Sequence, residues 1–185
     1  MDENLKYTFS NVNDWLKFAE AKNIALATID GAILFGIIQG WKEIPIWMHS
    51  EIKYILFPLL IISMLLIIWS FIPKLNYKKL KNKKNNPNND KKLKEEEINV
   101  LYYGHIKQLS SSELLERLDE NKNKTQIDCD LANQIIVNSK ISWDKNIVFK
   151  RAGYITFWAL IITSVAIIIN WKFGWDVISF IKNLI

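Results

Sequence analysis

The stretch LLIISMLLIIWSFI, residues Leu59 to Ile72, decides the fold, because it contains no charged side chain and serine is its only hydroxyl-bearing residue type. It belongs to an apolar block over residues 54–72. Two further apolar blocks cover residues 23–41 and 152–171. Each block is close to the ~20 residues that a helix needs to cross a bilayer. The sequence therefore predicts an all-α integral membrane protein with three transmembrane helices. A buried soluble helix is the alternative for the first block, which contains Asp30 and several glycines.

The positively charged residues predict the orientation in the membrane. Arg151 and two lysines precede the third block, and the predicted outer loop over residues 42–53 carries only two lysines. Six lysines follow the second block without an acidic residue among them: Lys74, Lys78, Lys79, Lys81, Lys83 and Lys84. Short loops rich in lysine and arginine stay in the cytoplasm. We therefore expect a cytoplasmic N-terminus and an outer C-terminus. Four tryptophans then lie at the outer interface, where such rings are enriched: Trp41, Trp47, Trp171 and Trp175.

The polar segment between the second and third blocks separates the first two predicted spans from the third. Residues 73–97 are rich in lysine and asparagine and have too few apolar groups to offset the entropy of ordering, which predicts a linker. Residues 98–151 predict a small, mainly helical cytoplasmic domain that acts as a sensor. At about 54 residues it is small for an independent hydrophobic core. We therefore expect it to depend on other parts or on further copies of the chain.

Local patterns predict the elements of this domain. The stretch INVLYYGHI over residues 98–106 is rich in β-branched and aromatic residues and predicts a short extended segment that ends at Gly104. Ser110 with Glu113 forms a capping-box pattern, which starts a helix, and Thr125 with Asp128 repeats it. No glycine or proline follows until Gly153. A single helix is therefore predicted from about residue 126 through the third apolar block.

Both ends of the chain have amphipathic patterns. In residues 1–22, apolar side chains at positions 5, 9, 12 and 16 lie on one helical face. This segment is expected to lie along the inner membrane surface or to pack on the cytoplasmic part. Residues 172–185 are too few to span a bilayer. They predict an interfacial helix in the outer leaflet, with a packed cap on the helix bundle as the alternative.

The first apolar block carries a stripe of small residues and one aspartate, which lie on different faces of the predicted helix. A stripe of small residues spaced four apart permits close approach of another helix: Thr28, Ala32, Gly36 and Gly40. Asp30 lies off this stripe, and an ionised carboxylate at mid-membrane costs at least ~2.5 to 3.5 kcal/mol. One interpretation has the stripe pack the helices while Asp30 lines a pore on the axis of a homo-oligomer. In the other, a protonated Asp30 hydrogen-bonds a hydroxyl of the third span: Thr156, Thr163 or Ser164.

Patterns for catalysis are missing from the sequence. His49 and His105 are its only histidines, and they are predicted on opposite sides of the membrane, which excludes a shared metal site. There is no glycine-rich phosphate loop and no H-E-x-x-H pattern. Cys129, the single cysteine, lies between two aspartates, which disfavour its thiolate. We expect no enzyme, no cofactor and no metal.

Charge and composition also bear on the partners of the chain. The formal net charge of +5 comes with a lysine run that lacks interleaved aromatic side chains for stacking on bases. It indicates membrane topology rather than nucleic-acid binding. The expected partners are the lipid bilayer and further copies of the chain.

Three stretches resemble the transmembrane-type Pycsar effector family. FAEAKNIALATIDGAIL at residues 18–34 resembles its start, where Glu20, Ala21 and Lys22 occupy an acidic–small–lysine pattern. YYGHIKQLS at residues 102–110 is similar to an aromatic-Gly-His motif, and DLANQIIVNSKISWDKNIVFKRAG at 130–153 is similar to a long helix entering the last span. The chain departs from the family in its longer, asparagine-rich linker and in Glu20, where aspartate is usual.

The resemblance implies a bacterial anti-phage effector without enzymatic activity. A companion cyclase makes a cyclic pyrimidine nucleotide, cCMP or cUMP, on infection. The effector senses this ligand and disrupts the inner membrane, which causes growth arrest or abortive infection. Two rival functions remain: a membrane anchor or scaffold for a partner protein, and a constitutive holin-like toxin.

Particular residues suit a cyclic nucleotide, which needs a cation for its phosphate and stacking or hydrogen-bonding groups for its base. We expect stacking and close backbone approach from Tyr103, Gly104 and His105. The candidate cations are Lys140, Lys145, Lys150 and Arg151. The alternatives are a core position for Tyr103 and a membrane-anchoring role for Lys150 with Arg151. Glu20 and Lys22 lie where the first span leaves the membrane, and they are predicted to form a gate by pairing with Arg151 or Asp144.

Overall fold

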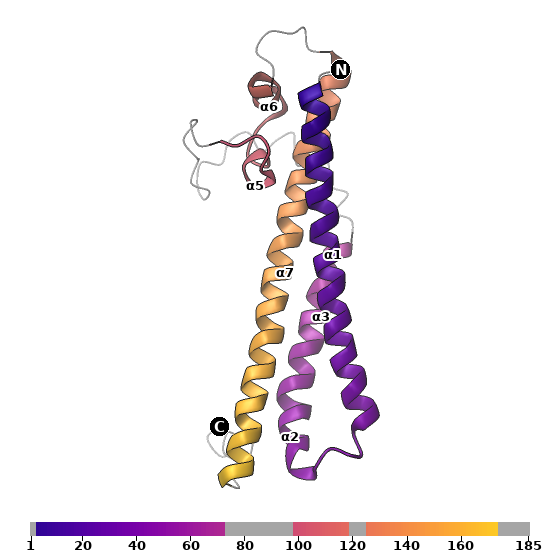
Figure 1. Cartoon of the computed structure of the whole chain (residues 1–185), viewed down its shortest axis with the longest axis vertical. Helices are drawn as coiled ribbons and strands as arrows, with labels where there is room; N and C mark the ends of the chain where they lie inside the picture. The colour runs from indigo at the N-terminus through magenta and orange to yellow at the C-terminus, as the bar shows by residue number, and fades with distance from the viewer. Residues whose placement is uncertain (1–2, 73–97, 119–124, 174–185) are drawn as a thin grey trace. The chain divides into compact units, whose positions relative to one another are not determined.

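A computed structural model describes residues 3–72, 98–118 and 125–173, and within these ranges all regular structure is helical. Helix α1 covers Glu3–Gly40, and α7 covers Gln126–Phe173 (Figure 1). Between them lie α2 (His49–Glu51), α3 (Phe57–Phe71), α5 (Tyr103–Ile106) and α6 (Ser111–Leu118). A 3₁₀ turn at Ile46–Met48 precedes α2, and a π-helical turn at Ile52–Leu56 joins α2 to α3. The predicted all-α fold is confirmed.

Three helical segments are long and apolar enough to cross a membrane: Glu3–Gly40, Ile46–Phe71 and Gln126–Lys172. They contain the three apolar blocks, and the third confirms the prediction of one uninterrupted helix through the last span. The first segment joins residues 3–22 of the predicted amphipathic region and residues 23–40 of the predicted span in a single helix. The predicted linker 73–97, most of the predicted interfacial helix 172–185 and Trp175 lie outside the described residues.

The extended segment predicted around INVLYYGHI is wrong from Tyr103 onward. Tyr102 has an extended backbone, with φ −102° and ψ 114°, and helix α5 begins directly after it. Tyr103 and Ile106 are both buried, and one helical turn brings side chains at this spacing to the same face. Burial of that face outweighs the β-propensity of the aromatic and β-branched residues, which depends strongly on context.

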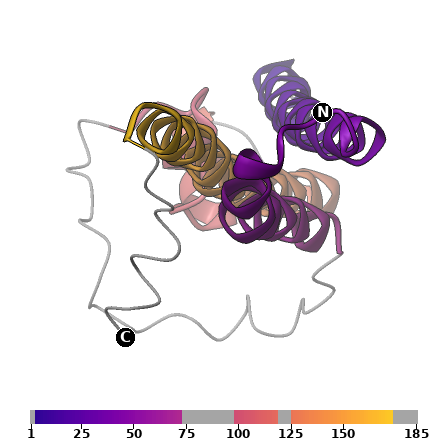
Figure 2. The same ribbon diagram turned by 90° about the horizontal axis from the view of Figure 1, so that it is seen from below.

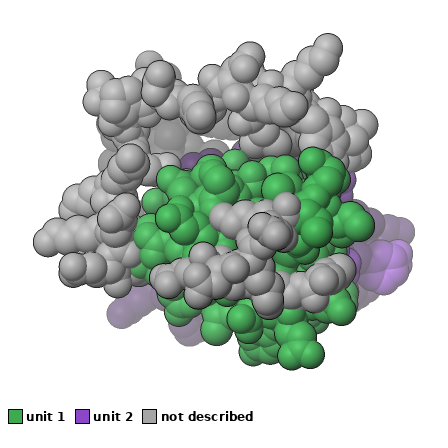
Figure 3. Space-filling model, turned by 90° about the horizontal axis from the view of Figure 1, so that it is seen from above, with its two compact units in different colours: residues 1–19, 72–145 green, residues 20–71, 146–185 purple. Residues whose placement is uncertain are grey.

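Unit 1 of the two compact units is formed by residues 1–19 and 72–145 (Figure 3). Its core combines side chains from α1, from α6, from the segment around α5 and from the first part of α7: Leu5, Val12, Ile106, Leu109, Leu114, Leu115, Ala132, Ile135 and Ile136. The N-terminal segment therefore packs on the part between the second and third spans, which is one of the two alternatives above. Because α1 contributes to this core, unit 1 does not rely on residues 98–151 alone.

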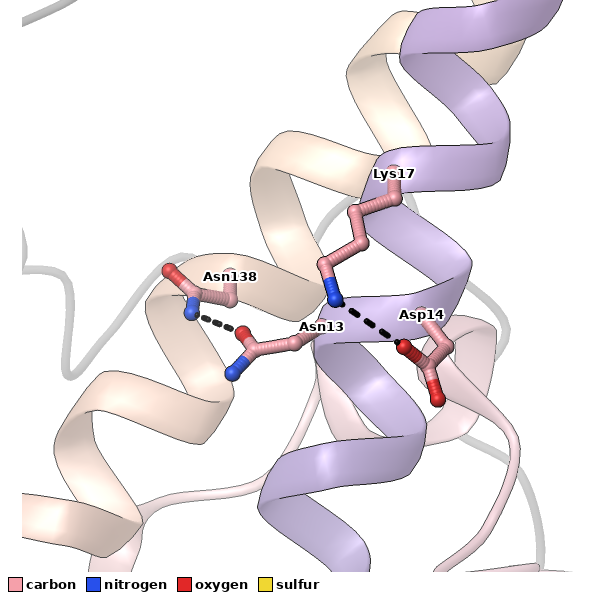
Figure 4. A network of polar contacts seen from close by, with 4 residues as sticks. All are labelled: Asn13, Asp14, Lys17 and Asn138. Carbon is pink, nitrogen blue, oxygen red and sulfur yellow. Dashed lines mark hydrogen bonds and ion pairs between the residues drawn. The ribbon is translucent and has the colours of Figure 1, made fainter.

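Polar contacts fix the helix ends and the α1–α7 pairing within unit 1. The Ser110 amide donates to Glu113 Oε2 at 2.7 Å, and the Glu113 amide donates to Ser110 Oγ at 3.3 Å, which confirms the first capping box. Thr125 and Asp128 make the reciprocal contacts that start α7. In Figure 4, Asn138 of α7 donates to Asn13 of α1 at 2.8 Å. The Lys17–Asp14 ion pair beside it lies within α1, at 3.3 Å.

Unit 2 is formed by residues 20–71 and 146–185. In its described part, portions of α1, α3 and α7 pack side by side (Figures 1 and 2). Leu26, Ile67 and Ala152 form one buried cluster of the three helices, and Leu56, Leu60 and Ala159 form another. The two alanines put small side chains of α7 at the contact, which lets helix backbones approach closely.

Candidate functional site

A cluster of aromatic rings lies in unit 1 around Tyr103. The Tyr103 ring centroid is 5.3 Å from that of Trp15 on α1, 4.9 Å from that of Tyr102 and 6.2 Å from that of Trp143 on α7. Three segments far apart in the sequence thus meet at one side chain. Tyr103 itself is buried, with 8% of its surface exposed, whereas Trp15 and Tyr102 are exposed at its edge. The predicted stacking residue is therefore the centre of an aromatic cluster, as its alternative core position implied.

The glycine of the Tyr-Tyr-Gly-His motif makes room for one of these rings. A Cβ atom at Gly104 would lie 2.5 Å from Cε1 and 2.8 Å from Cζ of Tyr102. Such distances are far inside van der Waals contact, so the Tyr102 ring occupies the space that a side chain would take. The close approach that we expected of a nucleotide at the Gly104 backbone is therefore made by the Tyr102 ring of the chain itself.

His105 and Tyr103 have polar environments that restrict their chemistry. His105 Nδ1 accepts a hydrogen bond from the Asn99 amide at 3.1 Å, and its ring meets the Tyr102 ring edge-on at 5.0 Å between centroids. This bond leaves Nε2 to carry the ring proton in neutral His105. Burial, and next the neighbouring Tyr102, raise the pKa of the Tyr103 hydroxyl above its usual value. Tyr103 therefore keeps its proton, and its capacity to donate, at neutral pH.

A cationic side chain lies beside these rings: that of Lys107, which follows the motif. Its Nζ lies 3.8 Å from the centroid of the Trp143 ring, within cation–π distance. Of the predicted cations, Lys140 and Lys145 lie on α7 within unit 1, where Lys145 is buried and Lys140 half-buried. Lys150 and Arg151 are exposed and belong to unit 2. The predicted nucleotide set is therefore divided between the two units.

A second polar site lies among the membrane-spanning helices of unit 2. The Thr156 hydroxyl of α7 donates to Asp30 of α1, at 2.9 Å to Oδ1 and 3.2 Å to Oδ2. Ser63 of α3 lies 3.0 Å from the same hydroxyl and 3.3 Å from the Ala152 carbonyl. All three side chains are buried. Asp30, Thr156 and Ser63 thus form a chain of polar contacts that links α1, α7 and α3.

The Asp30–Thr156 bond is one of the contacts named in the second alternative for Asp30, and the pore-lining role stays a prediction about assemblies of several copies. Unlike Asp30, the small-residue stripe is not buried against the other spans. Thr28, Ala32 and Gly36 are exposed within the single chain. A Cβ atom at Gly36 or Gly40 would meet nothing within 4 Å. In this chain the stripe does not make the contacts between the three spans, and its role in helix packing stays a prediction about further copies.

The predicted gate residue Lys22 contacts the part of α7 that belongs to unit 2, near the residue where that part begins. Its Nζ donates to Asn146 Oδ1 at 2.6 Å and lies 5.2 Å from the centroid of the Phe149 ring. Glu20 is half-buried on the same helix. The gate role of these residues stays a prediction, and Asn146 is an additional partner that the sequence did not indicate.

A comparison with known protein families identifies the family of the chain. The model of the Pycsar effector protein domain matches residues 4–170. The chain belongs to the Pycsar effector family. This family assignment implies an anti-phage effector that responds to a cyclic nucleotide. No curated protein and no solved structure gives a significant match to the chain.

The candidate site of this Pycsar effector includes residues that the sequence did not indicate. Trp15 and Trp143 carry no local motif, although Trp143 lies one turn beyond the predicted Lys140. Lys107 stands within the YYGHIKQLS stretch, and its place after the aromatic-Gly-His motif was the available signal. Within the described residues, no group of three or more His, Cys, Asp or Glu side chains can hold a metal ion.

Substituting Gly104 by alanine tests the packing of the Pycsar effector's aromatic cluster. We expect Gly104→Ala to push the Tyr102 ring outward, because that ring is at the protein surface and the new Cβ takes its place. Loss of its two aromatic contacts should lower the free energy of unfolding of unit 1 by about 1 to 3 kcal/mol. Denaturant unfolding of the full chain, followed by tryptophan fluorescence, measures this change.

Tyr102→Ala is the matched variant for this prediction. If Gly104 serves only to admit the Tyr102 ring, adding Gly104→Ala to Tyr102→Ala should not lower the free energy of unfolding any further. A full additional loss in the double variant would contradict the role assigned to Gly104.

Proposed function

We propose that the chain binds a cyclic pyrimidine nucleotide, cCMP or cUMP, through unit 1 and in response disrupts the bacterial inner membrane through unit 2. The outcome is growth arrest or abortive infection. The observation that supports this most is the aromatic cluster around Tyr103 with Lys107 beside it, in a chain of the Pycsar effector family. Binding alone produces the effect, and no catalytic step is required.

The ligand's two chemical parts correspond to two kinds of side chain in this cluster. A base stacks on an aromatic ring in a sequence-tolerant way, and Trp15, Tyr102 and Trp143 offer exposed or half-exposed ring surface. The Lys107 ammonium, 3.8 Å from the Trp143 centroid, lies where it can pair with the cyclic phosphate of a base stacked there. Gly104, His105, Lys140 and Lys145 remain candidate contacts from the same unit.

Helices α1 and α7 provide the route from ligand to membrane. Each contributes residues to both units, so Trp143 in unit 1 and Thr156 in unit 2 stand on one continuous helix. We propose that ligand binding reorients α7, alters the Lys22–Asn146 contact and breaks the Asp30–Thr156–Ser63 hydrogen bonds. The spans then separate and reassociate with other copies of the chain, with the stripe over residues 28–40 as the packing surface and Asp30 facing the conducting path.

In this proposal the N-terminus and unit 1 face the cytoplasm, where a companion cyclase releases the nucleotide, and the C-terminus lies outside. The positive residues that flank the third span support this orientation.

Calorimetric titration of the purified full chain with cCMP, cUMP, cAMP and cGMP tests the proposal. We expect saturable binding of cCMP or cUMP with a preference over both purines. Absence of binding by all four would rule out the sensor. Expression in cells with a potential-sensitive dye separates the rivals: collapse of the potential without a cyclase indicates a constitutive toxin, and no collapse with an active cyclase indicates an anchor.

A further inference from the structure

A cavity of about 780 Å³ lies in unit 2 at the end of the first two spans. Its lining comes from the last turn of α1, from the turn that follows and from the start of the second span: Ile38, Gln39, Trp41, Lys42, Lys53 and Phe57. The volume falls within the range of pockets that hold small molecules. Two ammonium groups, one amide and one indole N–H thus share a cavity with apolar side chains.

Neighbouring contacts hold the walls of this cavity in place. The Trp41 ring stacks on the His49 ring with centroids 4.5 Å apart and an interplanar angle of 27°. His49 Nε2 in turn bonds the Ile44 carbonyl at 2.9 Å, which ties the turn to the second span. Lys53 Nζ lies 5.3 Å from the Tyr54 ring centroid. A preformed wall reduces the entropy that a ligand must overcome on binding.

The nearest buried carboxylate is satisfied by other partners. Glu51 is buried, accepts from Asn170 Nδ2 at 3.1 Å and accepts from Ser50 Oγ at 2.9 Å. Asn170 also donates to the Trp47 carbonyl at 2.7 Å, so these bonds tie the end of α7 to the second span. Glu51 does not line the cavity, whereas two lysines do. The cavity therefore presents positive charge.

We propose that this cavity binds one anionic phospholipid. Its phosphate lies between Lys42 and Lys53, its glycerol oxygens meet Gln39, and an acyl chain follows Ile38 and Phe57. The position supports a lipid, because the cavity lies where two membrane-spanning segments end, at the depth of the headgroups, and Trp41 is of the residue type enriched there. The lining combines charged and apolar side chains. This combination matches a lipid, whereas a free phosphate has no group that would contact the apolar side chains. This inference does not depend on the nucleotide proposal.

Native mass spectrometry of the purified full chain in detergent tests this site, with phosphatidylglycerol and phosphatidylcholine of identical acyl chains in competition. We expect one phosphatidylglycerol to be retained in preference to phosphatidylcholine. Lys42→Gln combined with Lys53→Gln should weaken its binding roughly thirtyfold, since each of the two lysines at an anionic lipid surface contributes a factor of roughly five. Lys172→Gln, which removes an exposed lysine from the last turn of α7, should leave the binding unchanged.

Lys42→Arg combined with Lys53→Arg keeps both charges and should retain the lipid. If the glutamine variant fails to fold, the preference of the wild-type chain for phosphatidylglycerol decides the question by itself. Equal retention of both lipids, wild-type binding by the folded glutamine variant, or displacement of the lipid by inorganic phosphate would each overturn the proposal.

Discussion

Replacing Thr156 by valine should make the effector act on the membrane without its nucleotide. The substitution preserves the shape of the side chain and removes the hydroxyl that donates to Asp30 and contacts Ser63. A buried acceptor left without its donor costs about 1 to 3 kcal/mol. If the bonds exist only in the resting arrangement, the active population rises by roughly 5- to 150-fold. A potential-sensitive dye in cells that lack the cyclase measures the result as depolarisation, with protein levels checked by immunoblot.

Thr156→Ser is the control for this prediction, because it keeps the hydroxyl and should stay silent until the cyclase is present. A Thr156→Val chain that accumulates normally and stays silent without the cyclase would contradict the resting role of this cluster.

Asp30→Leu alone addresses the other role of the same carboxylate. If Asp30 faces the conducting path of the active assembly, this variant should lose depolarisation even with an active cyclase. Unchanged activity at normal expression would show that Asp30 does not line that path.

The second large effect is expected in unit 1, where Lys107→Gln should weaken nucleotide binding about tenfold to a hundredfold. Hydrogen bonds to charged groups contribute about 1.5 to 3 kcal/mol, and 1.4 kcal/mol corresponds to a factor of ten. The dependence of affinity on salt should fall at the same time, because a charge facing the phosphate is lost. Titration calorimetry at two salt concentrations measures both quantities.

Trp143→Ala should reduce the affinity by roughly 5- to 150-fold, the range of base stacking on one aromatic ring, and Trp143→Phe should recover most of it. Lys17→Gln is the matched control for Lys107→Gln, since Lys17 belongs to unit 1 but forms an exposed ion pair with Asp14. Wild-type affinity in both Lys107→Gln and Trp143→Ala would place the ligand elsewhere.

Periodicity and local patterns predict the helices of this protein well. The lack of charge in Leu59–Ile72 and the lack of glycine and proline before Gly153 are properties of contiguous sequence, so they identify spans and the continuous α7. The capping boxes depend on residues three apart, and both form as expected. The extended segment before α5 was wrong because burial of Tyr103 and Ile106 is a tertiary effect.

The candidate sites are harder to predict, because they join segments distant in the chain. The cost of burying a carboxyl group in a membrane predicts a polar partner for Asp30, and Thr156 is one of the three candidate hydroxyls. Ser63, on another helix, carried no such signal. In the same way the motif indicated Tyr103, whereas Trp15 and Trp143 reach it only through helix packing. The sequence thus indicated the residue with the strongest local constraint in each site and missed its neighbours.

Reconstitution of the purified chain into liposomes loaded with a self-quenching dye tests most directly whether a cyclic nucleotide converts this membrane protein from a resting to a disruptive state. We predict no leakage from liposomes without ligand, and leakage on addition of cCMP or cUMP that exceeds the leakage caused by cAMP or cGMP at the same concentration. Intact liposomes with all four nucleotides, or full leakage before any is added, would contradict this mechanism.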